Sequence, residues 1–403
     1  MTLLGFGGGT PESVTAEAKA ALEQAELVVG APRLLDALPP REGQRRIAAV
    51  HADELAELLA CESAAEVCAV FSGDTGFYSG ARALLPLLRE HGVECRVLPG
   101  LSSVQLLAAR LGRPWQDWTL CSAHGADCDP IAAVMRGKPA FFLTGGAQTP
   151  ATLCAELTET GLGDTRVTVG ENLSYEDERI TETTASECAK LVFAPLAVLL
   201  IEAVARPDAP VGGLADEAFL RGDVPMTKQE VRAAALSKLA VRRGDVIWDV
   251  GAGTGSVSVE LALAASEGRV YAVECRDEAL ALIEANKRRF GAWNLCVVRG
   301  RAPQALRDLP KPDTVFIGGS KGDLRAIIKA ALAANPAVRL CITAIALETL
   351  SAALEACKGM DLEMEIAQIA ANRAKLTGEL HLLMANNPTF LIMAKRREAT
   401  CSN

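Results

Sequence analysis

The sequence predicts an α/β protein built from two domains. Its 403 residues exceed the usual size of a single domain. Short apolar runs alternate with amphipathic helical stretches along most of the chain, a pattern that favours βαβ units and largely parallel sheets. The alternation stops between Pro207 and Thr227, where proline and glycine are frequent, which indicates a boundary. We therefore predict a first domain over residues 1–207, a linker over 208–226 and a second domain over 227–403.

Seven strands are predicted in the first domain, each a short apolar run bounded by turn-forming residues. They are Leu3–Phe6, Leu27–Val29, Val67–Phe71, Cys95–Leu98, Ala140–Leu143, Val167–Val169 and Ala197–Ile201. Helical periodicity between them is clearest over Val14–Ala25, Ser79–Glu90 and Ser102–Leu111.

A second βαβ series follows the boundary. Its predicted strands are Val246–Val250, Arg269–Glu274, Leu295–Val298, Thr314–Ile317 and Arg339–Thr343. Two further runs, Glu363–Ile369 and Thr389–Ala394, are predicted to pair as an antiparallel hairpin at the sheet edge.

Composition and charge exclude several classes of protein. The formal net charge is −9, so the chain lacks the general positive charge of a nucleic-acid-binding protein. Its twelve cysteines include no CxxC pair, and we predict no metal site. The longest apolar stretch, residues 194–205, is too short to span a bilayer and contains Glu202. We therefore expect a cytoplasmic protein with reduced thiols, no nucleic-acid partner and no membrane contact.

The strongest motif lies where the second series begins. An apolar strand ends at Asp249, and glycines follow at 251, 253 and 255 before a helical stretch. Such a turn lets the backbone and the first N–H groups of the helix approach a ligand closely. A dinucleotide-binding turn has the spacing GxGxxG, whereas this one fits GxGxG and has Ser256 at the last position. The carboxylate of Asp249 suits a cationic amino acid better than a pyrophosphate.

Together with Glu274, this turn resembles motif I of the Rossmann-like, S-adenosylmethionine-dependent methyltransferases. Glu274 ends the next predicted strand, where its carboxylate is placed to accept hydrogen bonds from both ribose hydroxyls. The alternative is an ordinary glycine turn of an α/β protein. The resemblance implies donor binding by Asp249, Gly251, Gly253, Thr254, Gly255, Glu274, Gly300 and Ala302, the last two at the adenine edge. At the end of the fourth strand, Gly318 and Gly319 leave room for a large flat substrate.

The first half contains three glycine- and serine-rich turns, each following a predicted strand. They are Gly5/Gly7/Gly9, Ser72-Gly73-Asp74-Thr75 and Pro99-Gly100-Leu101-Ser102-Ser103. In this order they resemble the tetrapyrrole methylase family, although Gly8, Thr10 and Thr75 depart from its usual pattern. The alternative is structural, with Asp74 as a helix N-cap and Ser102 and Ser103 as a capping pair.

The family resemblance implies a two-lobed α/β fold for the first domain and a second donor site. The residues implied in that site are Gly5, Gly7, Gly73, Asp74, Thr75, Ser102 and Ser103.

A tetrapyrrole-methylase-like half joined to a motif-I half with a mostly parallel sheet resembles the decarboxylating, bifunctional precorrin methyltransferases of cobalamin biosynthesis. That resemblance implies two S-adenosylmethionine sites per chain. It implies methylation of reduced precorrin-6 (precorrin-6B) at ring carbon 5 by the first domain. It assigns carbon 15 methylation, with loss of the carbon 12 acetate carboxyl, to the second, giving precorrin-8X. It also implies a homo-oligomer. A metal-free substrate is favoured over one containing cobalt, and the order of the two methylations stays open.

A tetrapyrrole carries many carboxylates, so basic residues near a cleft are candidate substrate contacts. We predict substrate contacts at His124, Lys228, Arg232, Gly318, Gly319, Lys321, Arg373 and Lys375, and we expect at least two of the cations to bind substrate. The alternatives are exposed surface cations, a capping or surface role for His124 and an ordinary strand-to-helix turn at the two glycines. No pattern identifies a catalytic residue, because the four histidines show no triad-like arrangement. Alternatives are a methyltransferase for another large planar substrate, an S-adenosylmethionine-binding regulator and a NAD oxidoreductase, which the GxGxG spacing disfavours.

Overall fold

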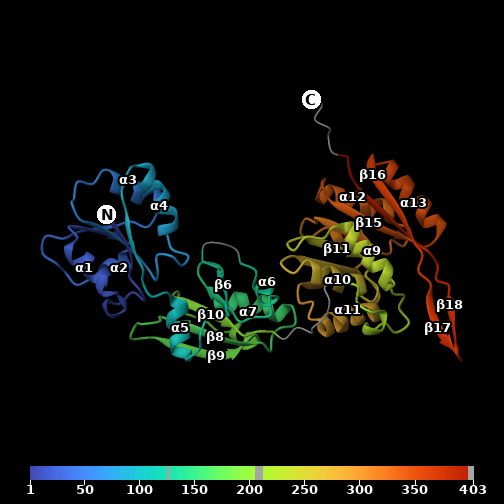
Figure 1. Cartoon of the computed structure of the whole chain (residues 1–403), viewed down its shortest axis with the longest axis horizontal. Helices are drawn as coiled ribbons and strands as arrows, with labels where there is room; N and C mark the ends of the chain where they lie inside the picture. The colour runs from blue at the N-terminus through green and yellow to red at the C-terminus, as the bar shows by residue number, and fades with distance from the viewer. Residues whose placement is uncertain (125–127, 205–211, 398–403) are drawn as a thin grey trace. The chain divides into compact units, whose positions relative to one another are not determined.

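The computed structural model describes residues 1–124, 128–204 and 212–397, and its chain divides into two compact units. The first unit comprises Met1–Pro130, Lys138–Glu159 and Gly163–Ala203, and the second consists mainly of Val204–Asn403 (Figure 1). Residues 205–211, where the predicted first domain ends and the linker begins, lie outside the described part. The boundaries at 207 and 227 therefore stay a prediction, and each unit is described by itself.

The first sheet of the first unit is parallel, with strand order β3-β2-β4-β1-β5. Its strands are β1 (Thr2–Gly5), β2 (Leu27–Gly30), β3 (Arg45–Ala48), β4 (Val67–Phe71) and β5 (Arg96–Leu98). The helices between them are α1 (Ala16–Gln24), α2 (Pro32–Asp36), α3 (Ala52–Ala60) and α4 (Ala81–Glu90). Because side chains alternate along a strand, Leu4 and Val28 enter one core and Leu3 and Leu27 the other. The sheet is thus covered by helices on both faces.

The second sheet has the order β6-β7-β10-β8-β9 and is mixed. Its strands are β6 (Thr119–Ser122), β7 (Ala140–Leu143), β8 (Arg166–Glu171), β9 (Arg179–Thr184) and β10 (Ala197–Ile201). Helix α5 (Ser103–Leu111) leads into this lobe, which also contains α7 (Pro150–Glu159) and α8 (Ala185–Cys188), and the chain between β6 and β7 forms the short helix α6 (Pro130–Val134). Only β6 and β7 are parallel, whereas β10 is antiparallel to both β7 and β8. The prediction of largely parallel pairing is therefore wrong for this lobe.

The second unit contains a seven-stranded sheet of order β13-β12-β11-β14-β15-β19-β16. The parallel strands are β11 (Val246–Val250), β12 (Arg269–Glu274), β13 (Leu295–Arg299), β14 (Thr314–Ile317) and β15 (Arg339–Ala344). Its helices are α9 (Gln229–Leu239), α10 (Ser256–Ala264), α11 (Asp277–Phe290), α12 (Leu324–Ala334) and α13 (Leu347–Lys358). The strand order reverses around β11, and such a switch point forms a crevice at the carboxyl ends of the strands.

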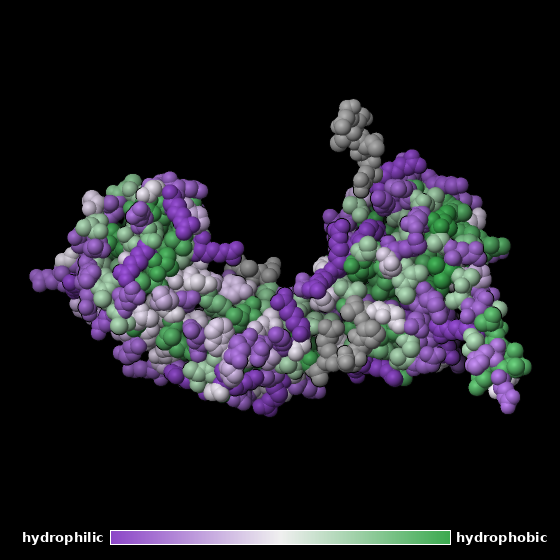
Figure 2. All heavy atoms as spheres, in the orientation of Figure 1, coloured by the Kyte–Doolittle hydropathy of each residue, from purple (hydrophilic) through white to green (hydrophobic). Residues whose placement is uncertain are grey.

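The two last predicted strands pair with each other in antiparallel orientation, as expected, but a further hairpin separates them in the sequence. Strand β19 (Thr389–Arg396) lies between β15 and β16 (Leu362–Ile369) and is antiparallel to both. The residues between β16 and β19 form a separate hairpin, which the sequence analysis did not predict, of β17 (Arg373–Thr377) and β18 (Leu380–Met384). The hairpin projects from the sheet and exposes Leu376, Leu380, Leu382, Leu383 and Met384 (Figures 1 and 2).

No described helix has the length and apolar character needed to cross a bilayer. Within the same residues, no group of three His, Cys, Asp or Glu side chains could hold a metal ion.

Candidate active sites

The glycine turn of the second unit is a tight backbone crossing at the end of β11. Gly251, Gly253 and Gly255 have φ values of +74°, +57° and +77°, a region that L side chains rarely adopt. A Cβ added at Gly251 would lie 2.6 Å from the carbonyl oxygen of Gly319, at the end of the neighbouring β14. Glycine is therefore required at position 251 by both conformation and space.

Asp249 is fully buried beneath this turn. Its Oδ2 accepts a hydrogen bond from the hydroxyl of Ser258 in α10, while its Oδ1 has no hydrogen-bond partner. Burial raises the pKa of Asp249 to about 7, against the lowering effect of the Ser258 hydroxyl and with a smaller raising effect from the charge of Glu274. The hydroxyl of Thr254 is likewise buried without a partner. Two unpaired polar atoms beside one turn fit a ligand with a cationic polar end.

Glu274 ends β12 and braces the same turn. Its Oε2 accepts from the Gly253 N–H at 3.0 Å, and its Oε1 accepts from the N–H groups of Cys275 at 2.9 Å and Arg276 at 3.1 Å. Burial opposes ionisation of this carboxyl, but the three backbone donors outweigh it and lower its pKa. A carboxylate has about four acceptor positions. The sequence interpretation needs two of them for ribose hydroxyls, whereas these donors leave about one open.

A cavity of about 500 Å³ opens at this edge of the sheet. The predicted donor and substrate residues that line it are Asp249, Gly251, Gly253, Thr254, Glu274, Gly300, Ala302, Lys228, Gly318, Gly319 and Lys321. Gly255 lies outside the lining, since it is the N-cap of α10 and packs against Ile283. Sequence reasoning missed Asn386 and Asn387, which line the cavity from the loop before β19.

The three turns of the first unit also converge. Gly7 and Gly73 exchange backbone hydrogen bonds of 3.2 and 2.8 Å, which join the first two turns. Asp74 accepts from the N–H groups of Gly100 at 3.1 Å and Gly76 at 3.0 Å, so it links the second and third turns. Asp74 does not cap a helix, because α4 begins only at Ala81. A Cβ at Gly5 would lie 2.5 Å from the Gly73 carbonyl oxygen, which explains glycine there.

Another cavity, of about 360 Å³, lies beside these turns and is called the first cavity because it belongs to the first unit. The predicted residues that line it are Gly7, Gly73, Asp74, Ser102, Ser103 and His124. Gly5 and Thr75 do not, since Gly5 is packed under Gly100 and the Thr75 hydroxyl donates to the Leu98 carbonyl. Ser102 has two roles, because it lines the cavity and also caps α5, where its N–H donates to Gln105. Sequence reasoning missed Arg33 and Tyr175, which no motif marks.

Comparison with known proteins shows that each half of the chain matches a protein family. A model for precorrin methyltransferase domains matches residues 217–396, and one for tetrapyrrole (corrin/porphyrin) methylases matches residues 1–189. A decarboxylating precorrin-6Y C(5,15)-methyltransferase of Sinorhizobium sp is 35% identical over 341 residues, 83% of this chain and 81% of the relative. The chain belongs to the decarboxylating precorrin-6Y C(5,15)-methyltransferase family. It is therefore a methyltransferase, and S-adenosylmethionine is the methyl donor that this family implies.

Two further relatives match about half of the chain. A probable cobalt-precorrin-6B C(15)-methyltransferase (decarboxylating) of Pyrobaculum calidifontis is 48% identical over 185 residues, 45% of this chain and 95% of that protein. A crystal structure of a precorrin-6Y C5,15-methyltransferase from Geobacter metallireducens is 37% identical, with a TM-score of 0.46, and covers 47% of this chain and all of that chain.

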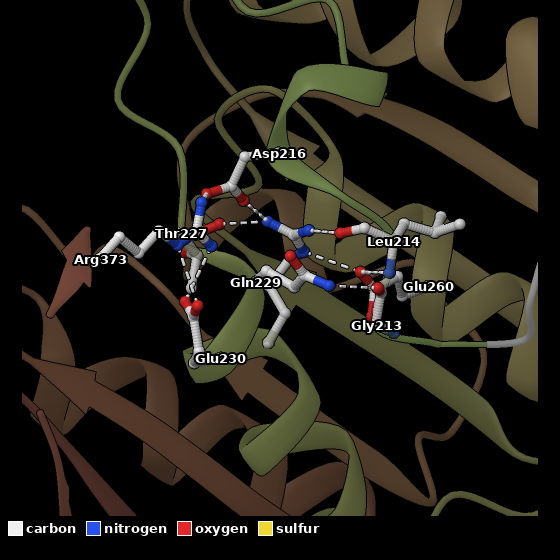
Figure 3. A network of polar contacts seen from close by, with 9 residues as sticks. Gly213, Leu214, Asp216, Thr227, Gln229, Glu230, Glu260 and Arg373 are labelled. Atoms are coloured by element: carbon white, nitrogen blue, oxygen red, sulfur yellow. Dashed lines mark hydrogen bonds and ion pairs between the residues drawn. The ribbon is translucent and has the colours of Figure 1, made fainter. Parts of the chain in front are cut away.

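Arg232 does not reach the cavity of this precorrin methyltransferase, so its predicted substrate role is wrong. Its side chain is fully buried, and Nε donates to Glu260 at 2.8 Å while Nη1 donates to Asp216 at 2.7 Å (Figure 3). Nη1 also donates to the carbonyl oxygen of Thr227, and Nη2 donates to that of Leu214. Four of the five N–H donors of the guanidinium thus have acceptors within the protein.

Arg373 and Lys375 are also outside the cavity lining. Arg373 forms ion pairs with Glu230 at 2.9 Å and Asp216 at 3.0 Å (Figure 3), and the Arg373 partner lowers the pKa of Glu230. Lys375 lies in the exposed hairpin strand β17. Of the five basic residues predicted as substrate contacts in this unit, Lys228 and Lys321 line the cavity, whereas Arg232, Arg373 and Lys375 do not.

Proposed function

We propose that this chain transfers methyl groups from two molecules of S-adenosylmethionine to ring carbons 5 and 15 of reduced precorrin-6. The carbon 12 acetate loses its carboxyl as carbon dioxide, and the product is precorrin-8X. The second unit performs carbon 15 methylation and decarboxylation, and the first unit performs carbon 5 methylation. The names of the relatives support the reaction, and two separate glycine-lined cavities in one chain support two donor sites.

In the second unit, the orphaned Oδ1 of Asp249 carries this proposal. A carboxylate at that atom would hold the ammonium group of the donor, and the buried hydroxyl of Thr254 would satisfy another polar atom. The remaining acceptor position of Glu274 would hold a ribose hydroxyl. Gly318 and Gly319 present bare backbone at the cavity and leave space for the edge of a macrocycle.

Positioning is the main contribution that this arrangement makes to catalysis. The donor, when bound, supplies an electrophilic methyl group, and the reduced macrocycle supplies an electron-rich carbon. Holding the two in line is worth up to about 7–11 kcal/mol of the barrier. Each new C–CH3 bond forms as the S–CH3 bond of the donor breaks, and the proton displaced from the ring carbon leaves to solvent. During decarboxylation, the electron pair of the broken C–C bond passes into the macrocycle, and the exocyclic carbon then takes up a proton to become a methyl group. No strong base from the protein is needed for either step.

Two measurements test the function. Calorimetric titration with S-adenosylhomocysteine should give about two equivalents bound per chain, and titration with NAD should give none. Incubation with reduced precorrin-6 and S-adenosylmethionine should give a product with two additional methyl groups and one carboxyl fewer, by mass spectrometry. A single bound equivalent would contradict the first donor site, and an unchanged tetrapyrrole would contradict the reaction.

We also propose a cytoplasmic homo-oligomer acting on the metal-free tetrapyrrole. The exposed apolar side chains of the β17–β18 hairpin support self-association. Sedimentation of the wild-type chain against a Leu380→Ser, Leu383→Ser variant tests it, and identical monomeric behaviour would contradict it.

A further inference from the structure

The side chain of Arg33 lines the first cavity and is held there by hydroxyl groups. It follows β2 in the short helix α2 and lines the cavity from the first lobe. Its Nη1 donates to the Tyr175 hydroxyl at 2.5 Å and its Nη2 to the Ser72 hydroxyl at 3.1 Å. Among the described residues, no carboxylate forms an ion pair with it. Within the part of the chain that the structure describes, it is also the only Lys or Arg that lines this cavity.

The two hydroxyl groups fix the guanidinium without neutralising it. Ser72 directly precedes Gly73 of the second turn, and Tyr175 comes from the other lobe of the same unit. The chain before Tyr175 is held in an uncommon conformation, since Asn172 and Ser174 have φ values of +48° and +79°. Neighbouring acidic groups are occupied elsewhere, Asp177 by Asn172 and Glu178 by Arg110. Asp74 also lines this cavity, but its two oxygens accept from the N–H groups of Gly76 and Gly100. Arg33 is therefore not held in an ion pair with any of these carboxylates and is available to an anion.

The first turn makes room for this contact. A Cβ added at Gly9 would overlap the Tyr175 hydroxyl and lie 2.9 Å from Nη1 of Arg33. Arg33 therefore lies directly over the glycine turn that lines the donor cavity. A planar guanidinium binds a carboxylate through two parallel, charge-assisted hydrogen bonds. These bonds are stronger than the ones that Arg33 forms with two neutral hydroxyl groups.

We propose that Arg33 binds a peripheral carboxylate of the tetrapyrrole in the first cavity, with Tyr175 and Ser72 orienting its guanidinium. This inference rests on the proposed function of the first unit, because it names a substrate contact for carbon 5 methylation. Arg33 sets the position of the macrocycle relative to the donor. It has no part in the reaction of the second unit.

Arg33→Gln is the test, and the second unit of the same chain is its internal control. Charge-assisted hydrogen bonds of this kind correspond to a roughly 10- to 100-fold change in KM. We expect that rise in KM for carbon 5 methylation, carbon dioxide release at the wild-type rate, and two equivalents of S-adenosylhomocysteine still bound. Arg33→Lys should recover part of the loss. Arg41→Gln, at an exposed position outside both cavities, should resemble the wild type.

Three outcomes would overturn the inference. They are a KM within about twofold of the wild type, a fall in kcat at unchanged KM, or loss of one bound equivalent of S-adenosylhomocysteine, which would make Arg33 a donor contact or a structural residue. Failure of the proposed function is seen separately, because the wild-type chain would then not add two methyl groups. Tyr175→Phe should change KM by less than about threefold, since it removes a neutral partner only.

Discussion

The carboxylate of Glu274 accepts a hydrogen bond from the backbone N–H of Gly253, with 3.0 Å between Oε2 and the nitrogen. One side chain thus joins the end of β12 to the glycine turn that follows β11. The same carboxylate accepts from Cys275 and Arg276, so it both shapes the cavity and faces it. Its removal should therefore affect ligand binding and local stability together.

Glu274→Ala should weaken S-adenosylhomocysteine binding at the second-unit site by tenfold or more, because charge-assisted bonds are worth about 1.5–3 kcal/mol each. Three backbone donors also lose their acceptor, so the second unit should unfold at a lower denaturant concentration. Calorimetry and urea unfolding separate these effects. Glu274→Gln keeps an acceptor oxygen and should lose less stability than affinity. Unchanged affinity in both variants would remove Glu274 from the donor site.

Donor affinity at the second-unit site should rise as pH increases from about 5.5 to 8. Burial raises the pKa of Asp249 to about 7, and only the ionised form attracts the donor's ammonium group. Well below pH 7 the slope should approach tenfold per pH unit. Asp249→Asn should bind weakly with a flat profile. Calorimetry in buffers of different ionisation enthalpy measures the proton released, and a wild-type profile as flat as that of the variant would contradict this role.

The same group affects the stability of the ligand-free protein in the opposite direction. Its folded pKa lies above the ordinary value of 3.8, so the folded protein retains a proton that the unfolded chain loses. The stability due to Asp249 is full below about pH 4 and is lost as pH rises through about 7. Above pH 7 Asp249→Asn should therefore melt at a higher temperature than the wild type.

Arg232→Met should destabilise the second unit by about 3–5 kcal/mol, because it leaves Glu260 and Asp216 as buried, unpaired charges. Arg373→Met should cost less, since that side chain is 36% exposed, and Lys375→Met should cost almost nothing. Urea unfolding measures the series. If Arg232→Met kept full stability but raised the KM for the tetrapyrrole, the substrate role that the structure contradicts would be restored.

Local features of the second half were predictable from sequence. The glycines, Asp249 and Glu274 all lie at strand ends, and in a parallel sheet those ends meet at one edge. The partners of Arg232 were not predictable in this way. Asp216 is 16 residues before it and Glu260 is 28 after it, and neither spacing distinguishes a buried ion pair from an exposed cation near a cleft.

The mixed sheet of the first unit escaped sequence reasoning for a different reason. Strand β9, "RITETT", contains a single large apolar residue and pairs only with β8 at the sheet edge, so it has no continuous apolar run. Arg33 follows the end of β2, a position that could have suggested a site. Its hydrogen bond with Tyr175, which lies 142 residues later, forms only because the two lobes of the first unit pack against each other, and the sequence pattern does not show this packing.

A fragment of residues 212–403 should fold alone, whereas one of residues 222–403 should be several kcal/mol less stable. Both large cores of the second unit draw only on residues from 214 onward. The longer fragment keeps the Gly213 and Leu214 N–H donors of Glu260 and the Asp216 partner of Arg232, which the shorter one lacks. Urea unfolding of the pair measures the difference, and equal stability would mean that this segment is dispensable.

The two reactions should be separable by one arginine in each cavity. Gly73 has open space beyond its Cβ, with Ser102 Cα nearest at 3.9 Å, so Gly73→Arg should fill the first cavity. That variant should yield a singly methylated, decarboxylated product.

The arginine that replaces Gly253 in Gly253→Arg should occupy the space of the donor's amino-acid end and abolish carbon dioxide release. A Cβ at this position would lie 3.3 Å from the Pro225 carbonyl oxygen. Gly43→Arg is the matched control, because Gly43 also has positive φ but open surroundings outside both cavities. Mass spectrometry and carbon dioxide capture read out each product. Normal carbon dioxide release by Gly253→Arg, with its first cavity intact, would show that decarboxylation does not belong to the second unit.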